Sequence, residues 1–93
     1  MLCRLRTPRG GTVPIYFTEF AYPSTVIRSN AKRADWTVRA YKWARRQGVR
    51  QLLYYTLVQP PRSSGIVFNS GMINPDGTPT PVFTALRRYL TGR

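Results

Sequence analysis

Apolar residues gather in four stretches of this chain, separated by segments rich in proline, glycine and small polar residues. The first stretch, Val13 to Phe17, is a short run of β-branched and aromatic side chains, which is typical of a buried strand. Pro14 has no N–H to donate to a β-ladder, so we expect it among the first residues of that strand. Residues 1–12 lack an apolar pattern and are expected to form a poorly ordered lead.

The second stretch runs from Ala31 to Gln47 and has helical periodicity. Trp36, Ala40, Trp43 and Ala44 fall on one stripe of such a helix. The stripe predicts that both tryptophans lie in a core between the helix and a sheet. Most of the remaining helix surface is basic, through Lys32, Arg33, Arg39, Lys42, Arg45 and Arg46.

Small residues mark both ends of this predicted helix. Ser29 or Asn30 can cap its first turn, and Gly48 suits the left-handed backbone just beyond its last turn. Directly after Gly48, Val49 to Leu57 form an aliphatic and aromatic run that predicts a second strand. Two strands joined by an amphipathic helix make a β-α-β unit with parallel strands. The predicted fold class is therefore α/β.

The rest of the chain combines a long loop with a last helix. Residues 58–81 are dense in proline, glycine, serine and asparagine, and within them Gly65 to Phe68 indicate a short extended piece. Asn74 to Gly77 read Asn-Pro-Asp-Gly, which predicts a tight turn. Thr80 is placed to cap a helix over Pro81 to Leu90, with proline at its favoured first position.

Length and charge suggest one small domain with an affinity for anions. The chain has 93 residues, and its fifteen Lys and Arg against three Asp and Glu give a formal charge of +12. Such a balance favours nucleic acid as a partner, and aromatic side chains can stack on bases. The basic residues stand singly or in pairs, however, and the aromatics alternate with aliphatics in runs that look buried. A small nucleic-acid-binding protein is thus the alternative to the function argued below.

Composition also excludes several chemistries. The chain has one cysteine, Cys3, and no histidine, so an internal disulfide, a Cys/His zinc cluster and a Ser-His or Cys-His pair are ruled out. No cofactor is indicated. No apolar stretch approaches the roughly 20 residues of a membrane span, and the N-terminus lacks the apolar core of a signal peptide. We therefore expect no membrane partner.

Glu19 is the main candidate for a catalytic residue, because it follows the first predicted strand directly. In β/α barrels the catalytic side chains lie at the carboxyl ends of the strands, where they project into the mouth of the barrel. A solvated glutamate, or one paired with an arginine, is the structural alternative for this position.

Three segments favour the catalytic interpretation by their order. "PIYFTEFAYPS" precedes the long helix, "GVRQLLYYTL" follows it, and "SGIVFNSGMINPDGTPTPVFTALRRYL" comes last. Together they resemble the seventh and eighth β/α units of retaining glycoside hydrolases with the TIM-barrel fold. In that family the seventh strand ends in Thr-Glu or a similar pair, and the final segment commonly reads Gly-Leu-x-x-x-Asp-Gly-x-Pro-Lys-Pro-Ala-Tyr-x-Ala-Leu. Gly65 to Val67 and Asp76 to Phe83 match that segment, with Thr80 in place of the lysine.

The resemblance implies an incomplete (β/α)8 barrel and roles for particular residues. Glu19 would be the nucleophile that forms a covalent glycosyl-enzyme. Tyr54 and Tyr55 alternate along the eighth strand, so one ring would face the barrel interior and contact the sugar while the other faces the helices. Tyr22 and Gln59 would be further substrate contacts. Core packing is the alternative for each strand tyrosine, and a solvated loop position is the alternative for Gln59.

The same resemblance implies that part of the catalytic machinery lies elsewhere. Retaining hydrolysis needs an acid/base carboxylate about 5 Å from the nucleophile. In this family that carboxylate comes from the fourth strand, and neither Asp35 in the helix nor Asp76 in the turn replaces it. We therefore expect a C-terminal fragment of a larger enzyme, inactive alone. Its expected partners are a carbohydrate substrate and the N-terminal portion of the barrel.

Overall fold

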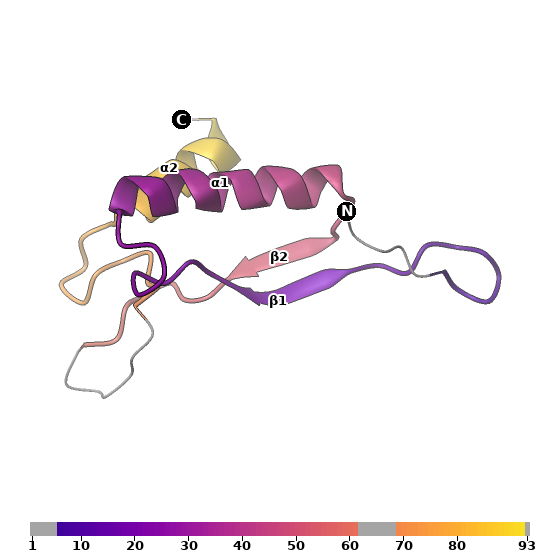
Figure 1. Cartoon of the computed structure of the whole chain (residues 1–93), viewed down its shortest axis with the longest axis horizontal. Helices are drawn as coiled ribbons and strands as arrows, with labels where there is room; N and C mark the ends of the chain where they lie inside the picture. Colours follow the sequence, from indigo (N-terminus) through magenta and orange to yellow (C-terminus); the bar gives the residue numbers. More distant parts are fainter. Residues whose placement is uncertain (1–5, 62–68, 93) are drawn as a thin grey trace.

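The computed structural model describes residues 6–61 and 69–92, which form a mixed α/β fold. Its elements are β1 (Tyr16–Phe20), α1 (Asn30–Arg46), β2 (Gln51–Tyr54) and α2 (Pro81–Thr91). Helix α1 lies over one face of the two-stranded sheet, and α2 packs against α1 (Figure 1). Neither helix covers the other face of the sheet. The predicted α/β class is confirmed, as a single β-α-β unit followed by a helix.

The two strands are parallel, as the β-α-β pattern predicts. Phe17 pairs with Leu52 and Phe20 with Tyr54, and the Arg50 N–H donates to the Ile15 carbonyl at 2.9 Å. Strand β1 begins at Tyr16 and therefore contains Glu19, which the sequence placed just after the strand. Strand β1 is thus shifted along the chain from its predicted apolar run, and β2 is shorter than its run at both ends. A strand persists only where a neighbouring backbone bonds to it.

Both helices begin directly after a predicted capping residue, whereas α1 ends one residue before the predicted Gln47 and α2 one residue after the predicted Leu90. The Ser29 hydroxyl accepts from the Lys32 N–H at 3.2 Å, and Gly48 has a φ of 73°, the left-handed backbone expected after α1. Thr80 caps α2 by accepting from the Phe83 N–H at 3.4 Å. Its hydroxyl donates to the Met72 carbonyl at 2.7 Å, which ties the start of α2 to the preceding loop.

The long loop returns to the sheet after β2. Backbone bonds join residues 72–73 to residues 56–59, including one from the Ile73 N–H to the Leu57 carbonyl at 2.8 Å. The predicted turn is confirmed, since the Gly77 N–H donates to the Asn74 carbonyl at 2.9 Å and Gly77 has a φ of 88°. The peptide bond between Tyr55 and Thr56 is cis. The extended piece predicted at Gly65 to Phe68 lies outside the described residues.

The start of the described chain forms a small turn of its own. Arg6 and Thr12 form an isolated antiparallel β-bridge, and the Gly10 N–H donates to the Thr7 carbonyl at 2.9 Å. Of the helices that the structure describes, none combines the length and the apolar character needed to cross a bilayer.

Two expectations about α1 are wrong. Trp36 and Trp43 are 40% and 37% exposed and do not lie in the core. They occupy one flank of the inward stripe, whereas α2 packs on the other flank, where Lys42 lies 5.7 Å from the Tyr89 ring centroid. Arg33, expected on the basic surface, is buried, because it shares the middle of the stripe with Thr37, Ala40 and Ala44. The buried apolar core consists of Ile27, Ala34, Ala44, Val82 and Leu86.

Candidate active site

A small cleft lies where the carboxyl ends of the two strands meet. It has a volume of about 150 Å³. Its lining comes from the end of β1, the segment after it, the residue after β2 and the returning loop: Glu19, Phe20, Ala21, Pro23, Tyr55 and Ser70. The structure therefore brings two of the predicted site residues, Glu19 and Tyr55, into one cleft.

A β-bulge decides where Glu19 points. Between Phe17 and Phe20, β1 advances by three residues while β2 advances by two, from Leu52 to Tyr54. In a regular strand Glu19 would share a face with Phe17, which lines the groove beneath α1. The extra residue instead keeps Phe17 and Phe20 on the α1 side and leaves Glu19 exposed beside Tyr55. Bulges commonly redirect a side chain in this way next to active sites.

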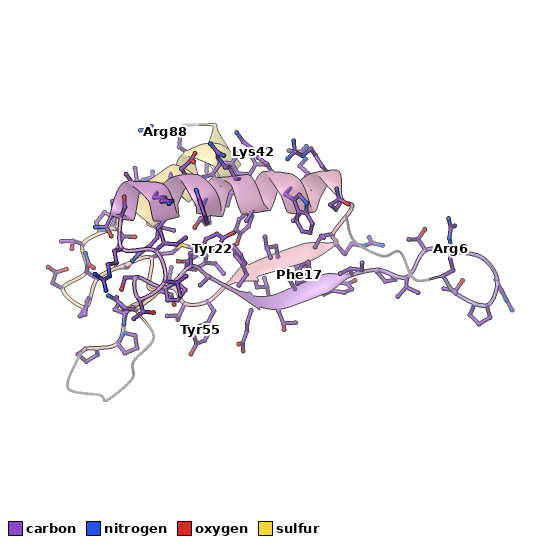
Figure 2. The ribbon with its side chains drawn as sticks, in the orientation of Figure 1. Arg6, Phe17, Tyr22, Lys42, Tyr55 and Arg88 are labelled. Atoms are coloured by element: carbon purple, nitrogen blue, oxygen red, sulfur yellow. The ribbon has the colours of Figure 1, made fainter. Side chains whose placement is uncertain are left out.

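The two strand tyrosines face opposite sides of the sheet, as their alternation predicts. Tyr55 is 46% exposed and points away from α1 (Figure 2). Tyr54 is half-buried on the helix side, where its ring meets Phe20 edge-on at 6.4 Å between centroids. Burial raises the pKa of Tyr54 above its usual value, an effect that the nearby Arg33 charge opposes. Its hydroxyl therefore stays protonated, and it donates to the Ser70 carbonyl at 2.7 Å.

Ser70 connects the returning loop to the end of β2. It is fully buried, and its hydroxyl donates to the Tyr55 carbonyl at 2.9 Å. Together with the Tyr54 bond, this contact links Ser70 to two consecutive residues at the end of β2. Ser70 was not predicted as a site residue, because a serine within a loop of 24 residues (58–81) carries no local signal of burial.

Gln59 has a structural role in the same loop. Its side-chain oxygen accepts from the Gly71 N–H at 2.8 Å. A Cβ on Gly71 would lie 2.5 Å from the Gln59 backbone nitrogen, so only glycine fits this close approach. Gln59 does not line the cleft around Glu19. The Gln59 side chain thus fixes the loop that carries Ser70.

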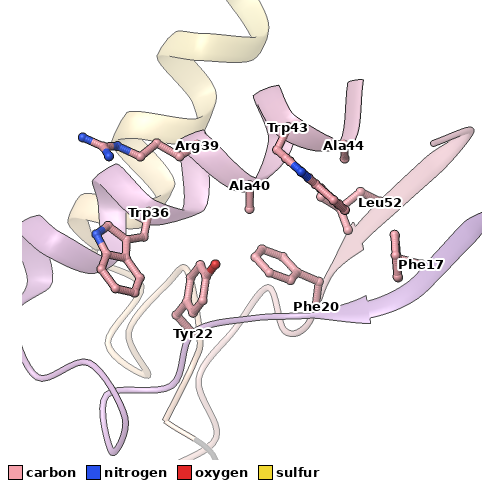
Figure 3. Close-up of a pocket in the computed structure, with 9 residues that line it drawn as sticks. All are labelled: Phe17, Phe20, Tyr22, Trp36, Arg39, Ala40, Trp43, Ala44 and Leu52. Atoms are coloured by element: carbon pink, nitrogen blue, oxygen red, sulfur yellow. The ribbon is translucent and has the colours of Figure 1, made fainter. Parts of the chain in front are cut away.

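Tyr22 lies apart from Glu19, in the groove beneath α1. Its ring meets Phe20 edge-on at 5.1 Å and Trp36 at 5.9 Å between centroids. Figure 3 shows Tyr22 and Phe20 side by side below the helix. Of the four substrate contacts that the resemblance implies, only Tyr55 lines the cleft with Glu19.

The three carboxylates of the chain lie in different places. Asp35 pairs with Arg39 at 2.9 Å on the exposed side of α1. Asp76 accepts from the backbone and hydroxyl of Thr78 in its turn. Within residues 6–61 and 69–92 no ion pair involves Glu19, and no three His, Cys, Asp or Glu side chains gather as a metal site would require. Among the described residues, Glu19 is therefore an accessible carboxylate without an ion-pair partner and lies beside an aromatic ring.

Comparisons with protein-family models, with curated proteins and with solved structures find no match for this chain. A free carboxylate with a neighbouring tyrosine can act as a nucleophile or base toward a small polar substrate, and the ring can stack on a sugar.

Proposed function

We propose that this chain supplies the nucleophile of a retaining glycoside hydrolase, as the seventh and eighth β/α units of a TIM barrel. The observation that carries the proposal is the bulge in β1. It turns Glu19 away from the helix side and toward Tyr55, at the carboxyl ends of two parallel strands. Active sites of β/α barrels are built at that end of the strands.

The sheet face that neither helix covers supports the barrel interpretation. Tyr16, Leu53 and Tyr55 are large apolar or aromatic side chains and are exposed there. Parallel sheets are normally buried on both faces, and in a closed barrel such side chains fill the interior. The face that carries Glu19 would then be the inside of the barrel, and α1 would belong to the outer ring.

In the proposed reaction, Glu19 attacks the anomeric carbon of an O-glycoside. The bond from that carbon to the leaving oxygen breaks as a second carboxylic acid protonates this oxygen, and a glycosyl ester forms on Glu19. Water, deprotonated by the same second carboxylate, then attacks the anomeric carbon and releases the sugar and Glu19. Tyr55 stacks on the sugar or bonds one of its hydroxyls.

The chain by itself lacks the second carboxylate. Asp35 and Asp76 are both held by other contacts, and neither lines the cleft. Retaining enzymes hold their two carboxyl groups about 5–5.5 Å apart, so the acid/base must come from another part of the barrel. We therefore expect no turnover by these 93 residues alone, and turnover only when a polypeptide supplying the missing strands is present.

The test uses this chain co-expressed with the polypeptide encoded directly upstream, assayed on a panel of aryl glycosides. Glu19→Gln should lower kcat/KM by about 10³-fold or more, the order of loss seen when other covalent nucleophiles are removed. Glu19→Gly with added azide should regain turnover and release a glycosyl azide of inverted configuration, because azide replaces the missing carboxylate. Asp35→Asn, which changes an exposed carboxylate on α1, is the matched control and should retain activity.

Undiminished turnover by a folded Glu19→Gln complex would overturn the nucleophile assignment. An upstream polypeptide without a β/α pattern, or a complex inactive on every glycoside in the panel, would count against the barrel itself.

A further inference from the structure

An apolar groove runs beside α1 on the opposite side of the sheet from Glu19. It has a volume of about 550 Å³ and is lined mainly by aromatic side chains. Phe17, Phe20 and Leu52 form its floor on the sheet, and Trp36, Ala40 and Trp43 form its wall on α1 (Figure 3). Both tryptophans of the chain lie here and remain more than one-third exposed. This is a large apolar surface for a small domain to leave in water.

The wall of the groove has the shape of a helix-packing surface. Ala40 stands between Trp36 and Trp43 at helical spacing, so a small side chain separates two large ones on the same face. Such a notch accepts a large side chain from a second helix packed alongside. Helix α1 has 17 residues, or about 25 Å at 1.5 Å per residue, which is long enough to pack against four or five turns of a partner helix.

The rim of the groove is basic. The Lys32 ammonium lies 4.9 Å from the Trp36 ring centroid, and Arg28 lines a second hollow that shares Tyr22 and Trp36 with the groove. Arg39 lines the groove itself, and the carboxylate beside it, Asp35, is already paired with this arginine. The rim therefore offers cations to a partner and no unpaired carboxylate among the described residues.

We propose that this groove binds an acidic amphipathic helix, which lays its apolar face against Trp36, Ala40 and Trp43 and its carboxylates along the basic rim. Charge selects this occupant over a second copy of the chain, since each copy carries a formal +12. In the barrel proposed above, this flank of α1 would face the preceding β/α unit, whose helix would be such a partner. Binding needs no chemistry at Glu19, so its test is read separately from glycosidase activity.

The test measures tryptophan fluorescence, because the only two tryptophans of the chain report on the groove directly. Three synthetic peptides of equal length serve as probes: a Leu/Glu amphipathic helix, a scrambled peptide of the same composition, and a Leu/Lys helix with the same stripe. The Leu/Glu helix should shift the emission to the blue and bind at least about tenfold more tightly than either control peptide.

Two variants locate the binding surface. Ala40→Glu fills the notch with a carboxylate and should weaken binding of the Leu/Glu helix by at least about tenfold. Trp43→Ala should weaken binding of the Leu/Glu helix to a similar extent, because contact area is lost, and Trp36 remains as the fluorescent reporter. This variant replaces Ala40→Glu in the test if Ala40→Glu does not fold. Leu90→Glu adds the same charge at an exposed position on α2 and should bind like the parent chain.

Equal binding of the scrambled peptide would overturn the proposal, because it would show attraction by charge without recognition of a helix. Equal binding of the Leu/Lys helix would also overturn it, because it would show that the basic rim does not select an acidic partner. A dimer in sedimentation equilibrium that Trp43→Ala dissociates would identify a second copy as the occupant and would also overturn it.

Discussion

Arg33 is a charged side chain in the middle of the inward face of α1, with 4% of its surface exposed. Its Nε has no hydrogen-bond partner among the described residues, and neither has the Oγ1 of Thr37, one helical turn further along. A buried polar group without a partner costs about 1–3 kcal/mol, and more for a charged group. Arg33 is therefore expected to lower the stability of the chain, because its Nε is buried without a partner among the described residues.

Replacing Arg33 by methionine should stabilise the protein. Methionine keeps most of the apolar stem and removes the buried Nε that has no partner among the described residues, so we expect the free energy of unfolding to rise by about 1–3 kcal/mol. Urea denaturation followed by circular dichroism measures this change. Arg39→Met, at an exposed position on the same helix, should leave stability within about 0.5 kcal/mol of the parent. Destabilisation by Arg33→Met would mean that the guanidinium has a partner in solution.

The packing of α2 on α1 depends on two buried side chains of α2, Val82 and Leu86. Leu86→Ala should lower the free energy of unfolding by about 2–5 kcal/mol, through lost burial and the cavity left behind. Leu90→Ala, in the same helix but 63% exposed, is the matched control and should change stability little. Similar losses for both variants in a denaturant titration would contradict the observed orientation of α2.

The turn before α2 should make stability depend on acid. Asp76 accepts from the Thr78 hydroxyl at 2.6 Å and from its N–H at 2.9 Å, and these bonds hold the pKa of the carboxyl below its usual value. A lowered pKa in the folded state gives stability that is present above about pH 4 and is lost as pH falls through the folded-state pKa. Asp76→Asn should therefore be less stable than the parent at pH 7, with the difference shrinking below pH 4. A difference in melting temperature that does not change with pH would show that the carboxylate charge is unimportant.

The charge of the whole molecule predicts general attraction to polyanions. Exposed cations lie on separate parts of the structure, for example Arg6 in the first turn, Arg45 on α1 and Arg88 on α2. We expect retention on heparin that salt reverses, with no preference among DNA sequences. Each single change of these three arginines to alanine should lower the slope of log K against log salt by a similar amount, about one or less.

Loss of binding confined to arginines on one face of the molecule would favour the nucleic-acid alternative. If Arg45→Ala and Arg88→Ala each abolished binding while Arg6→Ala had no effect, one face of the helices would be a dedicated nucleic-acid surface.

The predictability of this fold differs between helices and strands. Local signals define both helices, because Ser29, Gly48, Thr80 and Pro81 satisfy or end a helix through contacts within a few residues. The apolar runs in the sequence locate the two strands approximately. They do not locate the strand ends, because β1 and β2 end where the partner backbone no longer bonds to them. The exposure of Trp36 and Trp43 could not be predicted from the sequence, because it depends on the flank of α1 against which α2 packs.

The candidate site divides in the same way. Glu19 and the alternation of Tyr54 and Tyr55 follow from the order of residues along the chain. Residue order alone therefore predicts the helices, the parallel β-α-β unit and the candidate carboxylate, because these depend on neighbours close in sequence or on a regular period. The position of Glu19 beside Tyr55 and the bond from Ser70 to the Tyr55 backbone are defined only by the folded structure. A bulge and a returning loop arise from bonds between distant segments, which no local pattern specifies.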